Sequence, residues 1–253
     1  GFSGDNWVGG RGDKEIMKRV GIIGFGSFGK FLAEKLSSHA KVLVYSHRGV
    51  NSSWYAPLDE VAGCDYVVLA TPLESYDEVL ASIKPHLSPT SVIVDVCSVK
   101  TEPLQKISKH MPDQKVVATH PMFGPESAGV SVKGHTIIMC PDVSTADEYD
   151  MIKNFAESVD LNVMEMSAEE HDRGIATVQG LTFFIAHTLE VMKIHEEKLH
   201  TPSFQRLLDL AELEKHHSAE LFRTIQKGNP YTSEIRGRFL KAAEAIDNEI
   251  DKG

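Results

Sequence analysis

A serine and a histidine follow two apolar segments of this chain and carry side chains that can move a proton. Ser98 lies in Asp95–Lys100 (DVCSVK), and His120 lies in Thr119–Ser127 (THPMFGPES). An imidazole that titrates near neutrality can take the proton of a hydroxyl group while a hydride leaves the same carbon. A loop rich in proline and glycine is expected directly after His120, which favours a catalytic base over a structural histidine. The two residues therefore point to a site that oxidises an alcohol.

The segment Val20–Gly29 (VGIIGFGSFG) predicts where a dinucleotide that accepts the hydride would bind. It reads as a buried strand, a glycine turn and the start of a helix, in which the first glycine permits the tight turn and the second a close approach of pyrophosphate. The third lets the helix pack on the strand, and the helix N-terminus offers N–H groups to phosphate. The expected phosphate-binding residues are Gly24, Gly26, Ser27, Phe28 and Gly29. Thr71 and Pro72, directly after the strand expected at Tyr66–Ala70, are further expected cofactor contacts.

The residues after the second expected strand, Lys41–Tyr45, favour NADP over NAD. An NAD-selective fold usually has Asp or Glu at this point, which accepts hydrogen bonds from the ribose 2′-OH. This chain has Ser46, His47 and Arg48 instead. A hydroxyl, an imidazole and a guanidinium suit a 2′-phosphate, so we expect NADP, with NAD as the less favoured cofactor. The alternative is a solvated surface turn in which Arg48 contacts nothing.

Short apolar strands alternate with helical segments through the first two thirds of the chain, which predicts a doubly wound, Rossmann-type sheet. Helices are expected at Ser27–His39, Tyr76–Leu87 and Thr145–Ser158. Besides those named above, the expected strands are Ser91–Val96, Val116–Thr119, Thr136–Cys140 and Asn162–Met166.

The pattern changes after Ser167, because no convincing strand follows and apolar residues recur at helical spacing. We therefore expect a Rossmann-type dinucleotide-binding domain at 17–167 and an all-helical domain for substrate binding and dimerisation at 168–253. Residues 1–16 are rich in glycine and charge without periodicity, as in a leader, a cloning remnant or an upstream extension. His171 and Asp172 are expected to open or cap the first helix of the second domain.

Composition indicates an ordinary globular protein of 253 residues with a formal net charge of −10. That charge argues against non-specific binding of nucleic acid. No apolar run is long enough to span a bilayer and no signal peptide is recognisable, so a cytoplasmic location is expected. The three cysteines lack metal-ligand spacing, and no metal site is expected.

Four motifs give the chain a resemblance to a known family. MKRVGIIGFGSFG, the ATP of Ala70–Pro72, DVCSVK and THPMFGPESAG occur in this order, between about Met17 and His187. Together they resemble the prephenate and arogenate dehydrogenases of tyrosine biosynthesis. HPMFGPES is most similar to the arogenate dehydrogenases of plants.

The resemblance implies a role for each of the two proton-moving side chains. His120 would accept the proton of the ring hydroxyl, and Ser98 would orient that hydroxyl, the histidine or the nicotinamide. Hydride would pass to the nicotinamide and the ring would lose CO₂, a step driven by aromatisation. The product would be tyrosine from arogenate or 4-hydroxyphenylpyruvate from prephenate, and the family also implies a homodimer formed through the helical domain.

The chain departs from many bacterial members on the substrate side. Where they have a second histidine, this chain reads VQGLT, and Gln179 is the candidate replacement. Pro125 stands where a small hydroxyl residue is common, and Glu126 beside it is an expected substrate contact. Those members bind a substrate carboxylate through an arginine of the helical domain, for which Arg206 and Arg223 are the candidates here.

Two other functions stay open at this point. One is a reductase of the same two-domain plan that acts on a β-hydroxyacid or a cyclic imine, although such enzymes typically use a lysine of the second domain. The other is a sensor that binds NADP without turnover. The intact Ser98 and His120 argue against the sensor.

Overall fold

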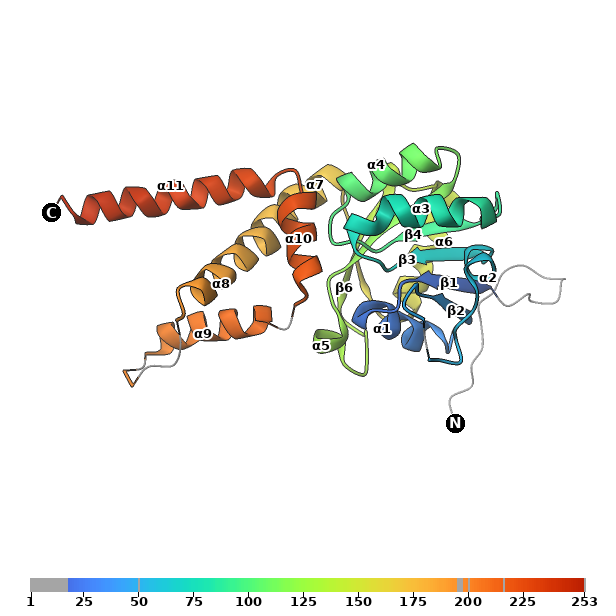
Figure 1. Ribbon diagram of the computed structural model, residues 1–253, viewed down its shortest axis with the longest axis horizontal. Coiled ribbons are helices and arrows are strands. Elements are labelled where there is room, and N and C mark those ends of the chain that lie inside the picture. Colours follow the sequence, from blue (N-terminus) through green and yellow to red (C-terminus); the bar gives the residue numbers. More distant parts are fainter. Residues whose placement is uncertain (1–17, 50, 195–197, 200, 216, 253) are drawn as a thin grey trace.

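A sheet domain and a helical region make up the computed structural model, which describes residues 18–49, 51–194, 198–199, 201–215 and 217–252. Figure 1 shows the sheet domain on the right and the helical region, with the C-terminus, on the left. The expected leader, residues 1–16, lies outside the described residues. None of the helices in these ranges combines the length and the apolar character needed to cross a membrane.

One seven-stranded sheet with the order β2-β1-β3-β4-β5-β6-β7 forms the core of the sheet domain. The pairs from β2 to β5 are all parallel. This arrangement and the helices that flank it confirm the predicted Rossmann-type, doubly wound sheet followed by a helical C-terminal region. The strands are β1 (Arg19–Ile23), β2 (Lys41–Tyr45), β3 (Tyr66–Leu69), β4 (Val92–Asp95), β5 (Lys115–Pro121), β6 (Thr136–Cys140) and β7 (Asn162–Glu165).

The strand β6 runs antiparallel to β5, which the alternating pattern did not predict. A parallel neighbour needs a crossover connection of about a dozen residues or more, usually a helix that packs on the sheet. The connection between β5 and β6 contains only the four-residue helix α5 (Pro125–Ala128), which cannot serve as such a crossover. The chain therefore turns back, and β7 then pairs parallel to β6.

Helices cover both faces of the sheet, so its side chains are buried on both sides. On one face α2 (Leu58–Ala62), α3 (Tyr76–Ile83) and α4 (Thr101–His110) pack on a cluster that includes Ile23 and Ile93. On the other face α1 (Ser27–Leu36) and α6 (Ala146–Ser158) pack on a cluster that includes Ile22 and Val94. Burial on both faces explains why the strands read as continuous apolar runs rather than as alternating patterns. Short 3₁₀ turns lie at Leu73–Ser75 (η1), Lys84–His86 (η2) and Pro141–Val143 (η3).

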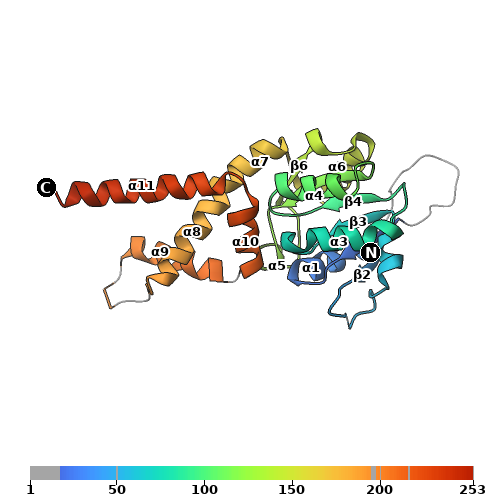
Figure 2. The ribbon, with the colours of Figure 1, turned by 45° about the horizontal axis from the view of Figure 1, so that its top comes forward.

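Two residues, Met166 and Ser167, separate β7 from the helical region. Its helices are α7 (Ala168–Ile175), the π-helical turn η4 (Ala176–Leu181), α8 (Thr182–Val191), α9 (Pro202–Lys215), α10 (Ala219–Gly228) and α11 (Thr232–Ile250). In both views α8, α9 and α11 extend away from the sheet domain, while α7 and α10 lie against it (Figures 1 and 2). The Nε atom of Arg223 in α10 lies 2.8 Å from Oε1 of Glu74 in η1, which ties α10 to the sheet domain.

The cap of α7 differs from the prediction. Ser167 is the N-cap and accepts a hydrogen bond from the N–H of Glu170, while the Glu170 side chain accepts from the N–H of Ser167. This reciprocal pair already caps the helix, so His171 and Asp172 do not. Both lie inside α7 and are buried.

Candidate active site

The glycine turn after β1 has the geometry that close contact with a phosphate requires. Gly24 has a φ of +110°, and a Cβ atom there would lie 2.4 Å from the carbonyl oxygen of Ala70, so only glycine fits. A Cβ atom on Gly29 would lie 2.2 Å from the carbonyl oxygen of Gly24, because α1 packs directly on the turn. Around Gly26, in contrast, a Cβ atom would meet nothing within 4 Å. The backbone at Gly26 is therefore open to a ligand.

The N-terminus of α1 and a buried hydroxyl next to the turn offer hydrogen-bonding groups to such a ligand. Gly26 is the N-cap of α1 and provides no side-chain cap, so the first N–H groups, including those of Ser27 and Phe28, are available to an anion. The Oγ1 atom of Thr71 is buried without a hydrogen-bond partner, and its methyl group lies beside Gly24. Pro72 follows as an exposed residue. These features fit the pyrophosphate of a dinucleotide.

The turn after β2 contains no acidic side chain. Its backbone closes with a 3.0 Å hydrogen bond from the N–H of Gly49 to the carbonyl oxygen of Ser46. Ser46 is half-buried, whereas His47 and Arg48 are exposed. All three residues follow the carboxyl end of β2, next to the glycine turn of β1. In this fold the ribose of a bound dinucleotide lies at this place.

His120 lies inside strand β5 rather than just beyond the end of the strand expected at Val116–Thr119. The strand β5 continues to Pro121, because Thr119, His120 and Pro121 pair with β6 after the parallel part of the sheet has ended. His120 is 3% exposed. The strand fixes the backbone of this histidine, and His171 packs against its ring.

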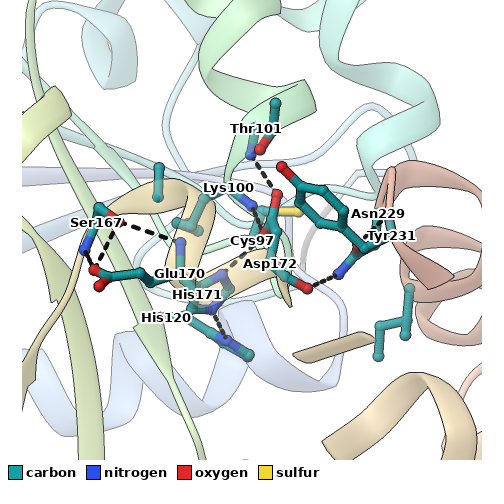
Figure 3. A network of polar contacts seen from close by, with 12 residues as sticks. Cys97, Lys100, Thr101, His120, Ser167, Glu170, His171, Asp172, Asn229 and Tyr231 are labelled. Atoms are coloured by element: carbon teal, nitrogen blue, oxygen red, sulfur yellow. Dashed lines mark hydrogen bonds and ion pairs between the residues drawn. The ribbon is translucent and has the colours of Figure 1, made fainter. Parts of the chain in front are cut away.

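A buried chain of three side chains connects the sheet domain to α7 (Figure 3). The Nδ1 atom of His120 lies 2.9 Å from Nε2 of His171, and Nδ1 of His171 lies 2.8 Å from Oδ1 of Asp172. His171 and Asp172 are 1% and 0% exposed. This contact was not predicted from the sequence, although Ser167-x-x-Glu170 is a capping-box signature that places both His171 and Asp172 inside the helix.

Asp172 also holds the start of α4 in place. Its Oδ1 and Oδ2 atoms accept 2.8 Å hydrogen bonds from the backbone N–H groups of Lys100 and Thr101. Its own carbonyl oxygen accepts a 2.7 Å hydrogen bond from the side-chain amide of Asn229 (Figure 3). Asp172 thus joins α7 to the start of α4 through its carboxylate and to the end of α10 through its backbone carbonyl, and the same carboxylate fixes the position of His171.

A buried ion pair lies on the same face of the sheet as His120. Lys100 and Asp95 are both fully buried and form the pair, and the Lys100 ammonium also donates to the carbonyl oxygen of Thr119. The hydroxyl of Tyr76 donates a 2.9 Å hydrogen bond to Oδ1 of Asp95. These contacts compensate the two charges and hold the residue next to His120 in place.

Burial and neighbouring charges determine which groups of the site are ionised. Burial lowers the pKa of His120 well below its ordinary value, and the nearby Lys100 acts in the same direction. Burial also lowers the pKa of His171, against the opposing effect of its bond to Asp172. Burial alone would raise the pKa of Asp172, but hydrogen bonds from His171 and Thr101 outweigh this effect and lower it. At neutral pH the site therefore holds two neutral imidazoles and one carboxylate.

Two more of the expected site residues border this region. Ser98 is half-buried in the loop after β4, and β4 pairs with the strand that carries His120. Gln179 lies in the π-helical turn that follows α7, and its Oε1 atom is buried without a hydrogen-bond partner. An unpaired buried oxygen is costly, so a bound donor would stabilise it.

Other expected substrate residues lie farther out. Glu126 is exposed on α5, and Arg206 is exposed on α9, which packs on α8 away from the sheet (Figure 1). Arg223 is at the boundary between sheet domain and helical region, where it pairs with Glu74. Within the described ranges, no group of histidine, cysteine and acidic side chains could hold a metal ion.

Comparison with known proteins gives matches in sequence. The family described as prephenate dehydrogenase, nucleotide-binding domain, matches residues 37–165. Arogenate dehydrogenase 2, chloroplastic, from Arabidopsis thaliana is 30% identical over 254 residues, which cover 94% of this chain and 71% of that protein. Arogenate dehydrogenase 1, chloroplastic, from the same plant is 28% identical, and the match covers 92% of this chain but 39% of that longer protein.

A solved structure has the same fold. The crystal structure of prephenate dehydrogenase from A. aeolicus, in complex with hydroxyphenyl propionate and NAD⁺, superposes with a TM-score of 0.73 at 20% identity. The superposition covers 94% of this chain and 93% of that one. The likeness therefore includes the helical region as well as the sheet domain.

Proposed function

Because this chain belongs to the family of prephenate and arogenate dehydrogenases, which are NAD(P)-dependent oxidoreductases, we propose that it catalyses the NADP-dependent oxidative decarboxylation of arogenate to tyrosine. Prephenate, which would give 4-hydroxyphenylpyruvate, is the alternative substrate of the same site. Arogenate comes first because the two plant relatives described above carry that name. The observation that carries the proposal is the position of the buried His120 near the carboxyl end of β5, at the end of the sheet where β1 runs into the glycine turn.

His120 is the proposed base. A neutral imidazole can accept the proton of the ring hydroxyl as the carbon that bears it loses hydride. Burial keeps the pKa of His120 low, so the ring stays unprotonated and ready to accept. The ring then loses its carboxylate as CO₂, and aromatisation makes this step favourable without a further acid or base. Ser98, after the neighbouring strand, is the proposed residue that orients the hydroxyl group.

The bound nicotinamide would supply the hydride acceptor, and the residues of this chain would hold and orient it. The open backbone at Gly26, the N-terminus of α1 and the unpartnered hydroxyl of Thr71 support binding of the pyrophosphate. The absence of an acid between Tyr45 and Gly49 and the exposed Arg48 support a 2′-phosphate, and hence NADP.

Gln179 is the proposed contact to the substrate in place of a second histidine. Its buried Oε1 atom has no partner, and an ammonium or hydroxyl group of the substrate would supply one. For a substrate carboxylate Arg223 is better placed than Arg206, because Arg223 lies where α10 meets the sheet domain. The exposed Glu126 would contact the substrate only if the loop around α5 moved inward on binding.

A homodimer formed through the helical region is the proposed assembly. Large apolar side chains on its outer helices are exposed, among them Val191, Met192, Leu240, Ile246 and Ile250. An exposed apolar surface of this kind is typical of an interface. Sedimentation equilibrium would test it: a dimer is expected for this chain, and a monomer for the Leu240→Lys/Ile246→Lys variant.

A spectrophotometric assay of nicotinamide reduction tests the activity. The purified protein is given arogenate or prephenate, each with NADP or NAD. We expect reduction with arogenate and a preference for NADP. Reduction with prephenate but not with arogenate would identify prephenate as the substrate. If the protein still binds NADP but reduces it in none of the four combinations, the proposed activity is refuted.

A further inference from the structure

We propose that His171, supported by Asp172, is a positioning residue that fixes the tautomer of His120 and leaves the Nε2 atom of His120 as the proton acceptor. The inference rests on the proposed function for its catalytic meaning, because it assigns the atom that takes the hydroxyl proton. The tautomer itself follows from contacts within the protein.

The carboxylate of Asp172 can only accept hydrogen bonds. Its two oxygens face the backbone N–H groups of Lys100 and Thr101 at 2.8 Å, and both groups are obligatory donors. These bonds and the bond to His171 lower the pKa of Asp172, so it is ionised at neutral pH. An ionised carboxylate has no proton to give. Nδ1 of His171 is the third group at this carboxylate, 2.8 Å from Oδ1, and must therefore carry the hydrogen.

His171 is consequently an acceptor toward His120. Burial lowers the pKa of His171, so the ring carries one proton, and that proton is on Nδ1. The Nε2 atom of the neutral ring then holds a lone pair. This atom lies 2.9 Å from Nδ1 of His120, with both rings buried, and two lone pairs cannot face each other at that distance.

The hydrogen between the two rings therefore belongs to Nδ1 of His120. Because burial also keeps His120 neutral, its Nε2 atom has no proton. A histidine without such a neighbour can hold its proton on either nitrogen, and only the form with a free Nε2 can act as a base through that atom. The hydrogen bonds from Asp172 through His171 to His120 thus select the tautomer of His120 with a free Nε2 before the substrate binds.

The same hydrogen bonds stabilise His120 after it has taken a proton. In the proposed reaction the O–H bond of the substrate breaks and a new N–H bond forms at Nε2, so His120 becomes a cation. Its Nδ1–H still donates to His171, whose basicity is raised by the carboxylate of Asp172. The charged groups around the two rings are Asp172, Lys100 and Asp95, and the charge of Lys100 is compensated by its ion pair with Asp95.

Nitrogen-15 NMR of the imidazoles tests the tautomer without any assay of activity. The His120 signals are assigned by their loss in His120→Asn. We expect a protonated Nδ1 and an unprotonated Nε2 in the unaltered protein at neutral pH. A proton on Nε2 of His120 would overturn the inference, whether or not the protein turns over arogenate.

Kinetics of two substitutions at position 171 test the positioning role. His171→Phe removes the acceptor, whereas His171→Gln keeps an oxygen toward His120 and an amide toward Asp172. For His171→Phe we expect kcat to fall by about 10- to 100-fold with little change in KM. The acid limb of its kcat/KM profile should move to lower pH, because the cation loses its acceptor. His171→Gln should recover most of the rate.

Arg173→Ala is the matched control, because this exposed residue of α7 pairs with Glu169 and makes no contact with His120. It should leave both kcat and the pH profile unchanged. Equal losses in His171→Phe and His171→Gln without a shift of the acid limb would show that His171 only supports the fold, and would overturn the proposal.

Discussion

The Nδ1 atom of His120 lies 2.9 Å from Nε2 of His171, so one hydrogen bond joins a strand of the sheet domain to the first helix of the helical region. Asp172 extends the connection to the start of α4. The proposed base is therefore in its reactive form only when α7 is docked on the sheet. In the proposed mechanism, catalysis would therefore depend on side chains that also hold α7 on the sheet domain.

The two buried histidines should make stability depend on pH. Burial lowers the pKa of both below the ordinary 6.5, so below that pH they are protonated in the unfolded chain and neutral in the folded one. The free energy of unfolding should therefore fall as pH falls through 6.5, by about 1.4 kcal/mol per pH unit for each proton taken up. Urea denaturation from about pH 7.5 to about pH 5.5 measures the slope. The slope should be shallower in His120→Asn, and an equal slope would contradict the assignment.

Removing the ammonium of Lys100 should destabilise the protein strongly. Lys100→Met leaves the carboxylate of Asp95 buried without its counter-ion, and the expected loss is about 3–5 kcal/mol. Lys106→Met is the matched control, since Lys106 pairs with the half-exposed Asp77 and should cost much less. Urea denaturation compares the two, and similar losses would contradict the importance of the buried pair.

Two alanine substitutions in the glycine turn should have different effects. Gly26→Ala places a methyl group where the protein leaves space, so we expect normal stability and an affinity for NADP that is lower by about tenfold or more. Gly24→Ala forces a side chain onto φ +110° and against Ala70, so it should lower both stability and affinity. Fluorescence titration with NADPH and thermal unfolding separate the two effects. Full affinity in Gly26→Ala would place the pyrophosphate elsewhere.

Arg48 should decide the preference between the two cofactors. Arg48→Ala removes the guanidinium proposed for the 2′-phosphate, and the affinity for NADP should fall by about tenfold or more while that for NAD changes little. Lys109→Ala, which removes an exposed cation of α4, is the control and should leave both affinities unchanged. Equal losses for both cofactors would assign Arg48 to another part of the dinucleotide.

The sequence predicted those features that depend on local pattern. Strands such as Tyr66–Leu69 are buried on both faces, so they read as unbroken apolar runs, and the glycine turn is defined by adjacent residues. The direction of β6 could not be read in this way, because it depends on whether the connection before β6 forms a helix long enough to pack across the sheet, and this one forms only the four-residue α5. The role of His171 could not be predicted either, because it also depends on a contact between residues distant in the sequence. Its partner His120 lies 51 positions away, and only docking of α7 brings the two rings together.

The role of His120 as the base is tested most directly by the rate of NADP reduction by His120→Asn with arogenate, measured beside the unaltered protein, with NADP affinity determined for both. Asparagine is polar and of similar size but cannot act as a base at neutral pH. We predict turnover by the unaltered protein, a loss in His120→Asn of about 10²- to 10⁴-fold and an almost unchanged affinity for NADP. A rate in His120→Asn equal to that of the unaltered protein would contradict the account, because the proton would then leave the substrate without His120.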